Sequence, residues 1–118
     1  MSAGASDDCL FCKIVAGEIP AETVLETDRS VAFRDLNPQA PTHVLVIPKL
    51  HQPNVAALAE HDPAALADLM ETVAAVAESE GLEGHYRLVF NTGSQVGQTV
   101  FHVHGHVLGG RSMGWPPG

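Results

Sequence analysis

Three histidines near the end of the 118-residue chain have the spacing and the chemistry of a functional site. His102, His104 and His106 are two residues apart. Side chains alternate between the two faces of a β-strand, so this spacing predicts a strand over 101–108 with all three imidazoles on one face. Histidine titrates near neutrality and can act as a nucleophile, an acid, a base or a metal ligand. We expect the activity to lie on this strand, the alternative being a histidine-rich strand that only faces solvent.

A second candidate is the pair Cys9 and Cys12, separated by two residues. A Cys-x2-Cys pair is half of a structural zinc site and is weak evidence when it stands alone. The alternative is two reduced thiols packed near the start of a short helix. A redox dithiol is disfavoured, because the pair does not follow a strand of a βαβ unit.

Composition narrows the classes of function. Six basic and fourteen acidic residues give a net charge of −8, without a run of Lys or Arg, which disfavours nucleic-acid and anionic-membrane binding. Bound phosphate must then be held by backbone N–H groups, helix termini or imidazole. No stretch approaches the roughly 20 apolar residues of a membrane span, and the first residues lack the pattern of a signal peptide. With only two cysteines, we expect a cytoplasmic protein.

The elements that must position these residues follow from periodicity and from helix and turn signals. Strands are expected at 24–26, 31–34, 42–47 and 86–91, besides the histidine strand, and a short helix at 10–16. A long helix is expected from the N-cap Asp62 to a stop at Gly81. This order favours an α+β fold with an antiparallel sheet of about five strands, and an edge that needs cover makes a homodimer plausible. Residues 1–8 are expected to be a flexible tail and 9–118 a single domain that includes an arm at 109–118.

The sequence His-Val-His-Gly-His-Val-Leu at 102–108 resembles the His-x-His-x-His signature of the histidine triad (HIT) superfamily. Segments 33–43 and 109–118 resemble the ribose-binding segment and the C-terminal tail of its Hint branch of nucleoside phosphoramidate hydrolases. The matches run from about Cys9 to Gly118. The resemblance implies a HIT-like fold and hydrolysis of the P–N bond in AMP–amine or GMP–amine conjugates through a nucleotidyl-histidine intermediate. That chemistry requires no cofactor.

The resemblance also implies roles for individual residues. His104 would be the nucleophile, His106 would donate to the phosphate oxygens, and His43 would help to orient His104. Thr99 stands where a serine hydroxyl is expected to serve the leaving amine. The other expected nucleotide contacts are Asp35 for the ribose, Asn91, Gly97 and Gln98 for the phosphate, and Phe11, Ile14, Ile19, Phe33, Leu36 and Leu45 for the purine.

For several of these residues an ordinary structural role is the alternative. His43 can be a satisfied core histidine, and Asp35, Asn91 and Thr99 can make turn hydrogen bonds.

The same resemblance completes the half zinc site. Some bacterial members of the superfamily add a histidine that follows an Ile-Pro-Lys strand and the first histidine of the triad. Here these residues are His51 and His102, which with Cys9 and Cys12 give a Cys2His2 set suited to tetrahedral zinc. In that case a structural zinc ion holds His102, and this imidazole is not available to the phosphate.

Two details qualify the resemblance. Gly105 stands where relatives carry a large apolar residue, which we expect to affect the rate more than the type of reaction. His106 stands where the transferase branch has glutamine, which favours a hydrolase. The remaining alternatives are a dinucleoside polyphosphate hydrolase of the same superfamily and a non-catalytic module that binds nucleotide or zinc.

Overall fold

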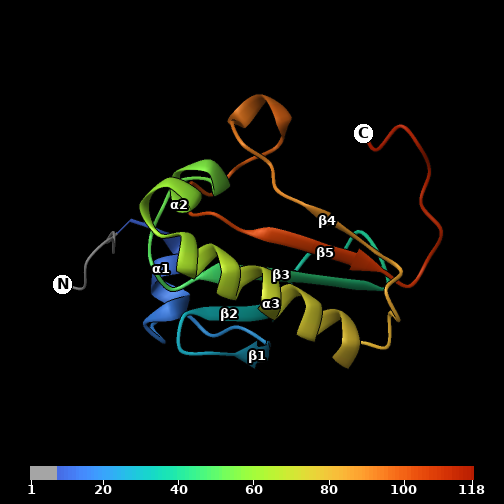
Figure 1. Cartoon of the computed structure of the whole chain (residues 1–118), viewed down its shortest axis with the longest axis horizontal. Coiled ribbons are helices and arrows are strands. Elements are labelled where there is room, and N and C mark those ends of the chain that lie inside the picture. Colours follow the sequence, from blue (N-terminus) through green and yellow to red (C-terminus); the bar gives the residue numbers. More distant parts are fainter. Residues whose placement is uncertain (1–7) are drawn as a thin grey trace.

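Five strands form one antiparallel sheet in the computed structural model, which describes residues 8–118 (Figure 1). The order across the sheet is β1-β2-β3-β5-β4. The strands are β1 (Thr23–Glu26), β2 (Ser30–Arg34), β3 (Thr42–Pro48), β4 (Tyr86–Val89) and β5 (Gly105–Gly109), and the helices are α1 (Leu10–Val15), α2 (Val55–His61), α3 (Pro63–Ser79) and the short 3-10 turn η1 (Ser94–Val96). The predicted α+β fold with a five-stranded antiparallel sheet is confirmed. Most of the predicted tail at 1–8 lies outside the described residues.

Strand β3 is the centre of the sheet, because its apolar and β-branched residues are buried on both faces. It pairs with β2 on one side and with β5 on the other, and this places Leu45 opposite both Phe33 and His106. The histidine strand and the buried central strand predicted from the sequence therefore lie side by side.

Helix α3 covers one face of the sheet (Figure 1). The Asp62 side chain accepts a hydrogen bond from the N–H of Ala65 at the start of α3, and Gly81 adopts a positive φ of 72° just past its end, as the sequence predicted. Leu69 and Val73 of α3 are among the residues that pack with the inner face of the sheet. Within residues 8–118, no helix combines the length and the apolar character needed to cross a membrane.

A smaller core lies on the opposite face, beneath α1. Phe11 of α1 packs there with a cluster that includes Phe33, Leu45 and Ile47. The chemistry-bearing residues gather on this face, because His106 and Leu45 are register partners while Val103 and Val107 belong to the core under α3. The predicted alternation of imidazoles and apolar residues between the two faces is thus present.

The structure differs from the predicted elements at two places. The histidine strand begins at Gly105 rather than near residue 101, because the N–H of Val103 donates to the carbonyl of Gln52 instead of joining the sheet. Helix α2 was not predicted, because Leu58 is its one fully buried residue and no apolar stripe marks it in the sequence. Its N-cap Asn54, which accepts from the N–H of Ala57, was the available signal.

The glycine inside the histidine motif has a packing explanation. A Cβ on Gly105 would lie 3.0 Å from both the Leu88 side chain and the Phe90 ring. These side chains occupy the space beside Gly105, so a larger residue at this position would require them to move.

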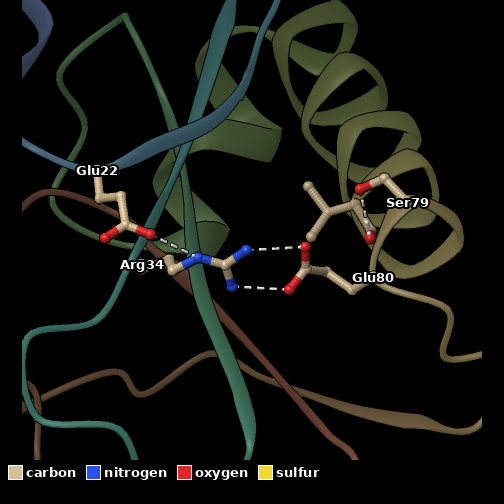
Figure 2. Close-up of polar contacts among 5 residues, drawn as sticks. Glu22, Arg34, Ser79 and Glu80 are labelled. Atoms are coloured by element: carbon tan, nitrogen blue, oxygen red, sulfur yellow. Dashed lines mark hydrogen bonds and ion pairs between the residues drawn. The ribbon is translucent and has the colours of Figure 1, made fainter.

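An ion-pair cluster connects the sheet to the end of α3 (Figure 2). The Arg34 guanidinium donates from Nη1 and Nη2 to the two Glu80 carboxylate oxygens at 2.7 and 3.0 Å. Its Nε lies 2.8 Å from the more exposed carboxylate of Glu22. The hydrogen bonds from Arg34 lower the pKa of Glu80. Arg34 thereby stabilises a carboxylate at the negative end of the α3 dipole, where it would otherwise be unfavourable.

We expect Glu80→Gln to lower the free energy of unfolding by about 1–2 kcal/mol, because the bidentate pair involves a carboxylate that is only 14% exposed. Glu22→Gln is the matched control, with little or no expected change, because that side chain is 75% exposed. Urea denaturation of the three proteins at pH 7 measures both effects. Equal destabilisation by the two substitutions would contradict this assignment.

Candidate active site and metal centre

A pocket of about 270 Å³ lies between α1, the end of β2 and the loop that precedes the triad. His104 and His106 line it. So do nine of the residues predicted to contact a nucleotide, namely Phe11, Ile14, Ile19, Phe33, Asp35, Leu36, Leu45, Gly97 and Thr99. A larger depression of about 720 Å³ beside β4 is lined by none of the predicted site residues.

Three of the predicted catalytic and nucleotide-binding residues do not line this pocket. Gln98 is buried, and its side chain accepts from the N–H of Gly93 and donates to the carbonyls of Pro53 and Val100. It therefore holds the loop in place rather than offering its amide to a ligand. Asn91 lies beside the same loop, with its amide nitrogen 3.8 Å from the Cβ position of Gly97. His43 is discussed below.

Several residues that line the pocket were not predicted from the sequence, among them Glu22 and Arg34, which add charge to a largely apolar wall. The signal for this part of the wall was the Ile-Pro-Ala-Glu segment at 19–22, where a proline imposes extended backbone beside the pocket.

The proton of His104 is placed by a backbone carbonyl. Its Nδ1 lies 2.9 Å from the carbonyl oxygen of His102, which can only accept, so Nδ1 carries the proton. The Nε2 of the neutral ring therefore has a free lone pair. Burial lowers the pKa of His104, which favours this neutral form. Phe11 packs edge-on against the ring, with the centroids 5.0 Å apart.

In His106 the proton is on the other ring nitrogen, Nε2, and this is determined by His43. The N–H of Gln39 donates to His43 Nδ1 at 3.0 Å, so the proton of neutral His43 is on Nε2. That Nε2 lies 2.9 Å from Nδ1 of His106, which must then accept and keep its own proton on Nε2. His104 and His106 therefore line the same pocket, with ring centroids 5.0 Å apart, as complementary tautomers: one with a lone pair at Nε2 and one with an N–H.

The resemblance implied that His43 helps to orient His104, but the structure gives His43 a different direct partner. His43 bonds to His106, while the carbonyl of His102 orients His104. The reason is register: His43 is opposite Leu108 and Leu45 is opposite His106, so His43 and His106 are diagonal neighbours on one face.

Asp35 stabilises a turn with its side chain and also lines the pocket. One carboxylate oxygen accepts from the N–H of Asn37 at 2.8 Å, and the other lies 3.4 Å from Nε2 of His43. Asp35, His43 and His106 are close enough together to suggest a metal site. The hydrogen bond from Gln39 argues against one, because it leaves the proton of His43 on the nitrogen that would have to bind the metal.

The second polar cluster lies at the start of α1 and contains Cys9, Cys12, His51 and His102. Nδ1 of His102 is 3.2 Å from Nδ1 of His51, 3.4 Å from Cys9 Sγ and 3.5 Å from Cys12 Sγ. In a zinc tetrahedron, two nitrogens are separated by about 3.3 Å and a nitrogen and a sulfur by about 3.6 Å. The four donors thus have the identity and spacing of a Cys2His2 site that can bind zinc.

The tautomer of His102 is the one that zinc binding requires. Its Nε2 donates to the carbonyl of Pro48 at 2.8 Å, which leaves the lone pair on Nδ1, the atom that faces both cysteines. A backbone carbonyl that orients a ligating histidine in this way is a common second contact of zinc sites. His102 is fully buried and is not among the residues that line the pocket.

The buried imidazole of His106 predicts a loss of stability in acid. Burial, with smaller contributions from His104 and His43, lowers the pKa of His106 from 6.5 to about 4. Between these two values the unfolded chain binds more protons than the folded one, so the free energy of unfolding falls as the pH is lowered from 6.5 to 4. The contribution of one group is at most about 1.4 kcal/mol per pH unit.

We expect His106→Gln to show a shallower loss than the unsubstituted chain in urea titrations at pH 6.5, 5.5 and 4.5. The zinc ligands are the same in both proteins, so the difference between the two curves isolates His106. Parallel curves would contradict the predicted pKa.

The sequence of this chain is similar to a known protein family and to several of its members. The HIT domain family matches residues 16–113. An uncharacterised HIT-like protein of Synechococcus elongatus is 55% identical over 114 residues, covering 96% of this chain and 99% of the relative. A 14 kDa zinc-binding protein of Zea mays is 47% identical over 111 residues, covering 92% of this chain and 87% of the relative.

Solved structures agree with the sequence comparison. A HIT family hydrolase from Legionella pneumophila has a TM-score of 0.89 and 51% identity, covering 94% of this chain and 100% of that one. A histidine triad nucleotide-binding protein from Candida albicans has a TM-score of 0.80 and 32% identity, covering 92% and 83%.

Proposed function

The chain belongs to the HIT domain family, and on that premise we propose that it hydrolyses purine nucleoside phosphoramidates. The observation that carries the proposal is the pair of complementary tautomers at one pocket. His104 offers a lone pair that can attack phosphorus, and His106 offers an N–H to the oxygen on which charge gathers. The Legionella and Candida relatives, named as a hydrolase and as a nucleotide-binding protein, support the same reaction class and ligand.

The proposed reaction has two displacements. Nε2 of His104 attacks the α-phosphorus, the P–N bond breaks, and the amine leaves with one proton that solvent supplies through the Thr99 hydroxyl at the pocket wall. Water then attacks the phosphohistidine and gives one proton back to solvent through the same hydroxyl, and breakage of the P–Nε2 bond releases the nucleoside monophosphate and restores the neutral imidazole. His106 donates a hydrogen bond to a non-bridging oxygen in both steps.

The shape of the pocket suits a nucleotide whose base is bound without base-specific contacts. Its volume of about 270 Å³ is just below the usual range for small-molecule sites, about 300–1,000 Å³. We propose that Phe11, Ile14 and Phe33 enclose the purine and that Asp35 accepts from the ribose hydroxyls. The phosphate then reaches the histidines beside the backbone of Gly97. Apolar walls discriminate weakly between adenine and guanine, so both AMP and GMP conjugates are expected substrates.

The test is direct. The protein is incubated with adenosine 5′-phosphoramidate, and AMP and the amine are quantified by chromatography. Release of both products in equal amounts, with a transient nucleotidyl adduct in acid-quenched protein, supports the proposal. Turnover of a dinucleoside polyphosphate alone would instead support the related hydrolase, and nucleotide binding without turnover of either would support a binding module.

The Cys2His2 cluster is proposed to hold a structural zinc ion, bound by Cys9, Cys12, His51 and His102. The cluster geometry and the zinc-binding name of the Zea mays relative support this proposal. Zinc there would cross-link α1 to the segment before β5, and no reaction step passes through it. Elemental analysis of protein purified without chelator is expected to give about one zinc per chain.

Two further proposals concern the assembly and the compartment. We propose a homodimer, supported by the position of β4 at the edge of the sheet and by the exposed C-terminal arm, in which the Trp115 side chain is 83% exposed. We propose a cytoplasmic location, supported by the low cysteine content, because two cysteines are too few for the disulfide framework of a small secreted protein.

A further inference from the structure

The metal centre and the proposed nucleophile share one residue. The imidazole of His102 faces the cysteines through Nδ1, while its main-chain carbonyl accepts the proton of His104 Nδ1 at 2.9 Å. The Nε2 of the same ring donates a hydrogen bond to the carbonyl of Pro48 at 2.8 Å. A metal ion bound to His102 would therefore restrain the carbonyl that sets the tautomer of His104.

A second connection runs through α1. Phe11 lies between the two cysteines in the sequence, and its ring packs edge-on against both His102 and His104, with centroids 6.0 and 5.0 Å away. Helix α1 has only six residues, and a helix this short has little stability of its own. Its first turn depends on Cys9, whose sulfur accepts from the N–H of Cys12 at 3.3 Å.

We propose that the Cys2His2 site is a positioning element for catalysis: metal bound there holds His102 and α1, and these hold His104 as the tautomer with a free Nε2. The proposal rests on the proposed function, because it takes His104 as the nucleophile. It goes further in giving the metal centre an effect on turnover as well as on folding, although the metal does not touch the substrate.

The experiment compares zinc-loaded protein with the same protein after chelator treatment and after zinc is returned. Side-chain ¹⁵N NMR at pH 8 reports the tautomer of His104, and the His104→Gln variant identifies its signals. We expect a protonated Nδ1 and an unprotonated Nε2 in the loaded protein. On zinc removal we expect the two ¹⁵N chemical shifts of His104 to move toward the average of the two tautomers. When zinc is returned, they should recover in proportion to the zinc bound. The kcat should fall by roughly 10-fold or more, with a smaller change in KM.

Unchanged His104 signals and unchanged kcat in folded, zinc-depleted protein would overturn the proposal. If zinc removal unfolds the chain, the zinc-loaded Phe11→Leu variant decides instead. It keeps the four ligands but loses the aromatic contact, so the His104 signals of the nucleotide-free protein should change at full zinc content. These signals decide, and not kcat, because Phe11 is also proposed to enclose the purine. Unchanged His104 signals would overturn the proposal. Lys13→Ala, on the same helix but not lining the 270 Å³ pocket, is the matched control and should behave as the unsubstituted chain.

The NMR measurement separates this proposal from the proposed function. If the loaded protein hydrolyses no phosphoramidate but the His104 tautomer follows zinc occupancy, the function is wrong and the coupling is right. If hydrolysis is found and neither the tautomer nor kcat responds to zinc, the function is right and the coupling is wrong.

Discussion

Replacement of His104 with alanine is expected to reduce kcat for adenosine 5′-phosphoramidate by about 10⁴-fold or more, the scale of loss found when a covalent nucleophile is removed. The backbone contact of the His104 imidazole leaves its Nε2 unprotonated and able to attack phosphorus. The neighbouring His106 cannot replace it as the nucleophile, because Nε2 of His106 carries a proton. Rapid-quench measurement of AMP release, with mass spectrometry for the nucleotidyl adduct, gives both the rate and the intermediate. The variant should form no adduct.

Two controls make this result specific. His61→Ala removes an exposed histidine from α2 and should leave kcat unchanged. Binding of AMP to His104→Ala, measured by calorimetry, should persist, because the purine and ribose contacts remain. Retention of more than a few per cent of the turnover by His104→Ala would show that His104 is not the nucleophile.

Removal of zinc is expected to lower the midpoint of thermal unfolding by roughly 10 °C or more. Structural zinc contributes several kcal/mol to folding, and in a chain of this size each kcal/mol shifts the midpoint by roughly 3–6 °C. The structural reason is that the four ligands come from three segments that are far apart in sequence, at 9–12, 51 and 102. Without the ion, α1 loses its cross-link to the rest of the fold, and the smaller core beneath α1 is weakened.

Calorimetric scans with and without a chelator measure the shift. The double variant Cys9→Ser and Cys12→Ser is the matched control: it should start at the lower midpoint and show no further change with chelator. An equal response of both proteins to the chelator would mean that its effect does not arise at this site.

Much of the architecture could be predicted because the relevant signals are local. The β-branched run of β3, and the cap and stop of α3, each determine an element from a few neighbouring residues. The face that carries the imidazoles also followed from a period of two, although β5 begins only at Gly105. Cys9 and Cys12 were suggested by their own spacing, whereas His51, His102 and most of the pocket came from the resemblance to the HIT superfamily; the structure brings these residues together.

What could not be predicted depends on contacts between distant segments. The partner of His43 depends on the register between β3 and β5, and one residue of slip would have placed it elsewhere. The role of Gln98 depends on the carbonyl of Pro53, 45 positions away. The packing at Gly105 requires knowledge that Leu88 and Phe90 occupy the space beside it.

The proton positions in the two imidazoles that line the pocket are determined by main-chain atoms: the N–H of residue 39, acting through His43, and the carbonyl of residue 102. Every amino acid has a main-chain carbonyl, and every one except proline has a main-chain N–H. The side chain at position 39 can therefore vary widely during evolution without disturbing the acid–base arrangement, whereas proline there would remove the N–H on which it depends. The proton arrangement of this candidate site is determined by the path of the backbone, so it can persist while the surrounding sequence diverges.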